Sequence, residues 1–175
     1  LAANALNISA ATPLSAQGAL TLNISSGINL TSDLNSAQGL TLISNNSISG
    51  NGRNVTSSNG VVNLTVFGNG NLTLNNSNLS GSNGVAVQNL GNGTASVTAS
   101  NLVSSQGIAA ISSGNGGLSI DRSSLNSTSG NVSLRNSGAG PVQLSNSAVT
   151  ATNVDILNSG NGTLSVSNSS FSVSN

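Results

Sequence analysis

Ionisable side chains are few in this sequence and lie far apart. The 175 residues include no His, Cys, Lys, Glu or Tyr, and the net charge is zero. The ionisable residues are Asp33, Asp121, Asp155, Arg53, Arg122 and Arg135. General acid–base catalysis needs a group that titrates near the working pH, and a nucleophilic serine needs a base beside it. The sequence supplies neither, so we expect no enzymatic activity and no catalytic residue.

Metal, cofactor and nucleic-acid sites are also not expected. Asp121 and Asp155 fall in different parts of the repeat described below, so they should not share a site. The adjacent Asp121 and Arg122 are typical of a solvated corner. The glycine-rich segment Gly114–Gly117 has no following lysine or helix, so we interpret it as a corner and not as a phosphate loop. A neutral chain has no field that attracts nucleic acid, and no apolar run approaches the roughly 20 residues of a membrane span.

A regular repeat organises the chain. Gly-x-Gly pairs recur at intervals of 22 to 24 residues, and we predict that they form structural corners. These glycines are Gly68, Gly70, Gly91, Gly93, Gly114, Gly116, Gly138, Gly140, Gly160 and Gly162. Aligning the repeats on these pairs places serine in one column throughout, which predicts a stacked ladder of Ser77, Ser100, Ser123, Ser147 and Ser169. A period of this length indicates stacked units that share one core.

Apolar residues alternate with polar residues in short runs within each repeat. Such alternation predicts strands with one buried face. The predicted core columns are Leu72, Leu74, Leu79, Val97, Leu102, Leu118, Ile120, Leu125, Val142, Leu144, Val149, Leu164, Val166 and Phe171. The intervening residues should face outward, among them Thr21, Thr41, Thr65, Thr73, Ser96, Ser119, Ser133, Gln143, Asp155 and Ser165. Gly and Asn between the runs accept the positive φ that sharp corners need.

Two all-β architectures could use such runs. An antiparallel sandwich or barrel gives no reason for a constant period, whereas a parallel β-helix places each residue over its counterpart one repeat later. We therefore predict an all-β, right-handed parallel β-helix with about 21 to 24 residues and three short strands per turn. Seven to eight turns would make a rod roughly 35 Å long. Residues 1–17 should form an irregular first turn or lead-in, 18–175 a single repeat domain, and 50–59 a loop.

The repeats resemble a known family. The blocks GALTLNISSGINLTSD, QGLTLISNNSISG and GNGTLSVSNSSFSVSN are similar to passenger repeats of filamentous-haemagglutinin-like adhesins, over roughly residues 15–175. Gram-negative bacteria export these large exoproteins by two-partner secretion or as autotransporters. The resemblance implies a β-helical stalk, secreted or held at the outer-membrane surface, that serves adhesion, biofilm formation or delivery of a toxin domain located elsewhere.

We therefore expect a non-enzymatic structural stalk of a surface adhesin or fibre, which mediates attachment or presents other domains. The chain lacks an initial Met, so we expect a processed product or a segment of a longer protein. No cap is recognisable at the C-terminal end, so neighbouring turns or copies stacked end to end are the expected partners. A host or bacterial receptor would be a further partner, which the sequence does not identify.

Three alternatives remain open at this point. The first is an ice- or glycan-binding β-helix that uses a Thr/Ser/Asn face, motivated by Thr21, Thr41, Thr65 and Thr73. The second is a self-assembling extracellular filament subunit. The third, a polysaccharide lyase or hydrolase on the same fold, is disfavoured because the chain has no acidic or basic cluster.

Overall fold

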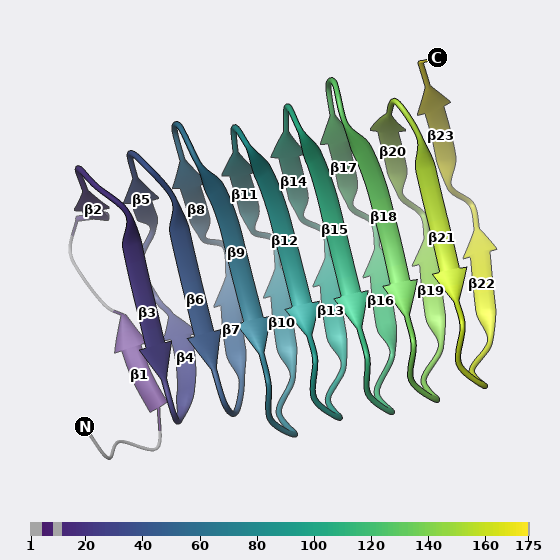
Figure 1. Cartoon of the computed structure of the whole chain (residues 1–175), viewed down its shortest axis with the longest axis horizontal. Helices are drawn as coiled ribbons and strands as arrows, with labels where there is room; N and C mark the ends of the chain where they lie inside the picture. The colour runs from purple at the N-terminus through teal and green to yellow at the C-terminus, as the bar shows by residue number, and fades with distance from the viewer. Residues whose placement is uncertain (1–4, 9–11, 175) are drawn as a thin grey trace.

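Strands one repeat apart pair in parallel throughout the chain. The structure is a computed structural model that describes residues 5–8 and 12–174. Leu72 pairs with Ala95, Ala95 with Leu118, and Leu118 with Val142, so residues of one sequence column are direct neighbours between turns. The strands form three parallel sheets, and the chain visits each sheet once per turn for about seven turns (Figure 1). The predicted all-β solenoid with three strands per turn is confirmed.

The strands of the three sheets follow one another in a fixed order. Sheet A contains β1 (Ala5–Ile8), β4 (Gly27–Leu30), β7 (Ile48–Asn51), β10 (Leu72–Asn75), β13 (Ala95–Thr98), β16 (Leu118–Asp121), β19 (Val142–Ser145) and β22 (Leu164–Ser167). Sheet B contains β2 (Leu14–Ala16), β5 (Leu34–Ser36), β8 (Asn54–Ser57), β11 (Asn78–Gly81), β14 (Asn101–Ser104), β17 (Ser124–Ser127), β20 (Ala148–Ala151) and β23 (Ser170–Val173). Sheet C contains β3 (Leu20–Ile24), β6 (Leu40–Ser44), β9 (Val61–Val66), β12 (Gly84–Asn89), β15 (Gly107–Ser112), β18 (Asn131–Asn136) and β21 (Val154–Asn158).

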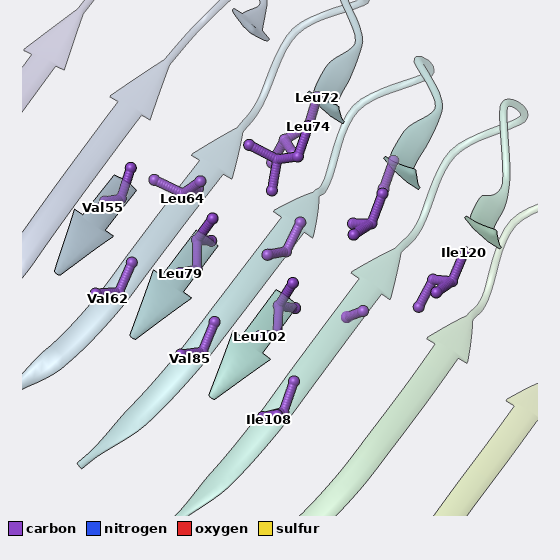
Figure 2. Close-up of a cluster of buried hydrophobic side chains, with 14 of the residues drawn as sticks. Val55, Val62, Leu64, Leu72, Leu74, Leu79, Val85, Leu102, Ile108 and Ile120 are labelled. Atoms are coloured by element: carbon purple, nitrogen blue, oxygen red, sulfur yellow. The ribbon is translucent and has the colours of Figure 1, made fainter. Parts of the chain in front are cut away.

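One apolar core runs between the three sheets. Side chains from all three sheets point into this space, as Leu74, Leu79 and Val85 illustrate in Figure 2. Leu72, Leu74, Leu79 and the other predicted core residues as far as Val149 are at most 1% exposed. Because each side chain is covered by the turns before and after it, burial is nearly complete even in a narrow coil.

The core prediction is wrong for the last coil. Leu164 is 50% exposed, Val166 45% and Phe171 43%. These residues continue the inward columns of Val142, Leu144 and Val149 in strand register. Their side chains are nevertheless exposed because a coil covers them on one side only. Burial in a solenoid thus depends on neighbouring coils as well as on strand alternation.

The loop prediction for residues 50–59 is also wrong. This segment contains the end of β7 and all of β8, and Val55 is fully buried. The predicted lead-in 1–17 includes β1 and β2, which pair with β4 and β5 in the same way as later strands. Residues 1–4 and 9–11 of that segment lie outside the described residues. The coils thus begin N-terminal to residue 18.

Replacing a leucine of one core column should have an effect that depends on its coil. Leu118→Ala removes a side chain that is 1% exposed, so we expect a loss of about 2 to 5 kcal/mol in the free energy of unfolding. Leu164→Ala, in the same column, should cost less than about 1 kcal/mol because half of that side chain is already in water. Urea denaturation of both variants measures the difference, and equal losses would contradict the described burial.

Candidate functional site

The carboxylates are separated by the fold. Asp33 precedes β5, Asp121 ends β16 in sheet A, and Asp155 lies in β21 of sheet C. Asp121 and Asp155 therefore do not share a site, as their places in the repeat predicted. Among residues 5–8 and 12–174, no group of three or more His, Cys, Asp or Glu side chains could hold a metal ion.

Each carboxylate has local partners. Arg122 Nε lies 2.8 Å from Asp121 Oδ2 on an exposed corner, and Arg135 pairs with Asp155 between neighbouring strands of sheet C. Exposed ion pairs of this kind contribute little to stability. The exposed position of the Asp121–Arg122 pair agrees with the interpretation of these two residues as a solvated corner.

Two carboxyl groups titrate below their ordinary range. Asn146 Nδ2 and Ser145 Oγ donate to Asp121 Oδ1 at 2.9 and 2.8 Å, and these hydrogen bonds lower the pKa of Asp121 from 3.8. The backbone N–H and the side-chain amide of Asn54, each at 2.9 Å, likewise lower the pKa of Asp33, with a smaller contribution from the Arg53 charge. Hydrogen bonds to the ionised form favour that form.

Stability should fall in acid through these two groups. Because their pKa values are lowered in the folded state, their stabilisation is present above the ordinary value of 3.8 and disappears as the pH falls through the lowered values. We expect a thermal midpoint that is constant above about pH 5 and decreases below about pH 4. In a double variant with Asp33→Asn and Asp121→Asn, the decrease should be smaller. An unchanged decrease in melts from pH 7 to pH 2 would contradict this assignment.

The serine column forms the predicted ladder, at the bend between sheets A and B. The backbone N–H of Ser77 donates to Ser100 Oγ at 3.0 Å, and the same bond recurs from Ser100 to Ser123 and from Ser123 to Ser147. Each hydroxyl in turn donates to the carbonyl two residues earlier, for example Ser123 to Asp121 at 2.8 Å. The ladder therefore joins neighbouring coils through alternating backbone and side-chain groups.

A residue with positive φ precedes each serine of this ladder, and the sequence pattern did not predict it. The φ angles of these residues are close to 50°. The residues are Asn76, Ala99, Arg122, Asn146 and Asn168. Of these three residue types only Asn adopts this left-handed conformation readily, so Ala and Arg are strained there. Because the column holds three residue types, aligning the repeats gave no signal for it.

The serine ladder can be tested against a neighbouring serine. Ser123→Ala removes the acceptor of the Ser100 N–H, which is buried, so we expect a loss of about 1 to 3 kcal/mol. Ser127 is equally buried, but its Oγ has no hydrogen-bond partner within the described part of the chain. Ser127→Ala should therefore be neutral or stabilising by up to about 1 kcal/mol. Denaturation of both variants measures the change in the free energy of unfolding. An equal loss for Ser123→Ala and Ser127→Ala would contradict the ladder.

Relieving the strained corner should stabilise the protein. Ala99 has a φ of 48° and an exposed side chain, so Ala99→Gly removes strain with little loss of packing. We expect a gain of about 1 kcal/mol in the free energy of unfolding. Ala109 in strand β15 does not have a positive φ, so Ala109→Gly is the matched control and should cost about 0.5 to 1 kcal/mol. A loss in both variants would refute the assignment of strain.

The Gly-x-Gly corners require glycine for a reason other than the predicted positive φ. None of the ten predicted corner glycines has a positive φ among the backbone angles of the described residues. Instead, a Cβ at Gly91 would lie closer than 3.0 Å to the carbonyl of Gly68 in the preceding coil, and a Cβ at Gly114 would meet Gly91 in the same way. The corners thus need glycine because their backbones stack in contact.

Asparagine side chains hold these corners in place. Asn136 Nδ2 donates to the carbonyls of Gly138 and Gly140 at 3.0 and 2.6 Å, and to Asn158 Oδ1 at 3.2 Å. Asn89 accepts from the N–H of Gly91 at 3.1 Å. These buried amides replace the inter-strand partners that the bent backbone lacks.

The threonines that motivated a binding face do not form one array. Thr21 pairs with Thr41 in sheet C, but the column continues with Asn63 and Ala86. Thr73 lies in sheet A, and Thr65, predicted to face outward, is only 4% exposed. The other predicted outward residues are exposed or half-buried. A regular threonine face is therefore absent from the described residues.

Comparison with known proteins finds no match: no family model, curated protein or solved structure matches the chain. The structure itself is compatible with a β-helix repeat protein. The described residues include no helix that is long and apolar enough to cross a bilayer.

Proposed function

We propose that this chain is a non-enzymatic rod segment of a secreted or surface-exposed bacterial fibre or adhesin. The observation that carries the proposal is the uninterrupted core, which joins all three sheets from coil to coil along the molecule. Such an architecture transmits force and spans distance because every coil is hydrogen-bonded to the next. The similarity of its repeats to filamentous-haemagglutinin-like passenger repeats supports a place at the surface of a Gram-negative cell.

The last coil supports end-to-end contact as part of this function. Leu164, Val166, Phe171 and Val173 are 43 to 50% exposed there, beside unpaired strand edges. Exposed apolar strands with free backbone groups favour addition of further β-structure. Further coils of a fibre, or a second copy of this chain, would cover this surface. The second possibility makes the chain a filament subunit, which is our second candidate.

Small-angle scattering and negative-stain microscopy at several concentrations test the proposal. The rod function predicts a stable elongated particle roughly 35 Å long. The filament function predicts concentration-dependent fibres with an axial repeat of about 4.8 Å. Phe171→Asp should then suppress fibre growth, whereas Val103→Asp, on the side of the rod, should not.

Two outcomes would contradict the rod function. An expanded chain without a defined shape would remove the β-solenoid on which the proposal depends. Hydrolase or lyase activity that disappears on mutation of a single aspartate would show that the chain is an enzyme.

A further inference from the structure

A hollow lies on the outer face of sheet A, across β4, β7 and β10. Its volume is about 440 Å³, within the range of small-molecule sites. Most of its lining residues carry a hydroxyl or an amide, one is an arginine, and the remaining two are Leu30 and Gly50. The residues on which the argument depends are Asn29, Ser49, Asn51, Arg53, Thr73 and Asn75.

Arg53 stands at a position that other coils fill with the ladder serine. The N–H of Arg53 donates to Ser77 Oγ at 3.4 Å, as the N–H of Ser77 donates to Ser100 Oγ. Arg53 Nε donates to the carbonyl of Asn51, two residues earlier, at 3.1 Å. This is the bond that Ser77 Oγ makes to Asn75 in the next coil. The arginine therefore makes the two hydrogen bonds that a ladder serine donates, but its guanidinium has no oxygen to accept the N–H of the preceding coil. It also carries additional donors toward the hollow.

Among the described residues, the guanidinium of Arg53 forms no close ion pair and acts on the Asp33 carboxylate only at longer range. Arg122 and Arg135 each form an ion pair with an aspartate, but Arg53 has none within 4.0 Å among the described residues. Both oxygens of Asp33 accept hydrogen bonds from Asn54. The two Nη groups of Arg53 thus remain available as a planar pair of donors, the geometry that binds a carboxylate.

The uncharged groups of the hollow are held in place by bonds between coils. Ser49 Oγ donates to Asn29 Oδ1 at 3.0 Å, and Asn75 Nδ2 donates to Asn51 Oδ1 at 3.4 Å. Side chains ordered in this way lose little entropy when a ligand binds. Hydroxyls and amides both donate and accept hydrogen bonds, which matches the hydroxyl groups of a sugar ring.

We propose that this hollow binds a carboxylate-bearing saccharide, with the carboxylate on Arg53 and the sugar hydroxyls on the amide and hydroxyl side chains of β4, β7 and β10. The site goes beyond the proposed rod function, because a rod needs no ligand on its flank. Failure of the site would leave the rod function unaffected.

Arg53→Ser is the decisive variant because it restores the ladder serine. It should fold with unchanged or higher stability, so any loss of binding is a loss of recognition. Trigalacturonate titrated into the isotope-labelled protein should shift the amide signals of β7 and β10. In Arg53→Ser we expect affinity to fall about tenfold or more. Arg135→Ser, on sheet C, is the matched control and should bind like the unchanged protein.

Neutral galactotriose and sodium acetate complete the test. Both should bind much more weakly than trigalacturonate, because galactotriose lacks the carboxylate and acetate lacks the sugar hydroxyls. The proposal is overturned if trigalacturonate causes no signal shift up to about 10 mM. Equal binding by Arg53→Ser, by galactotriose or by acetate would overturn it as well.

Discussion

Every residue of this protein must be compatible with its counterpart one turn earlier and one turn later. Parallel pairing in constant register places Leu72, Ala95 and Leu118 directly over one another, at the spacing of about 4.8 Å between strands. The space allowed to a side chain is therefore set mainly by the adjacent coils. Columns of Leu, Ile, Val and Ala fill the interior, glycine occupies corners where backbones touch, and serine links the bend between sheets A and B through its N–H and Oγ.

The same constraint explains the near absence of charge. Like charges that stand opposite each other on adjacent strands are destabilising, and a charged column would repeat that cost at every turn. Hydroxyl and amide groups donate and accept, so they can stack on themselves. The charged residues are isolated in their columns, and Asp121 and Asp155 have an arginine partner, while Asp33 has the amide of Asn54. Arg53 is the one arginine of the described residues without an ion pair within 4.0 Å, and this difference motivates the proposed saccharide site.

Structural features that have the same residue type in every repeat could be predicted from the sequence, and features without such a recurring residue type could not. Column identity was enough to derive the fold, the inward residues and the serine ladder, because stacked positions share a residue type. The left-handed corner at Asn76, Ala99 and Arg122 was missed because three residue types share one backbone conformation. Residues 50–59 were misassigned as a loop because Gly52 and Arg53 depart from the column types while keeping the register. The exposure of Leu164 depends on whether a neighbouring coil covers its side chain. The alternation of apolar and polar residues within a strand carries no information about that.

Hydrogen exchange of the ladder amides tests the in-register stacking most directly. The N–H groups of Ser77, Ser100 and Ser123 are buried and donate to the hydroxyl of the next coil. They should therefore exchange as slowly as the strand amides of sheets A and B, and Ser123→Ala should accelerate the Ser100 amide in particular. Ladder amides that exchange as fast as the exposed corner amides, or a Ser100 amide unaffected by that substitution, would contradict the stacking on which this account of the fold depends.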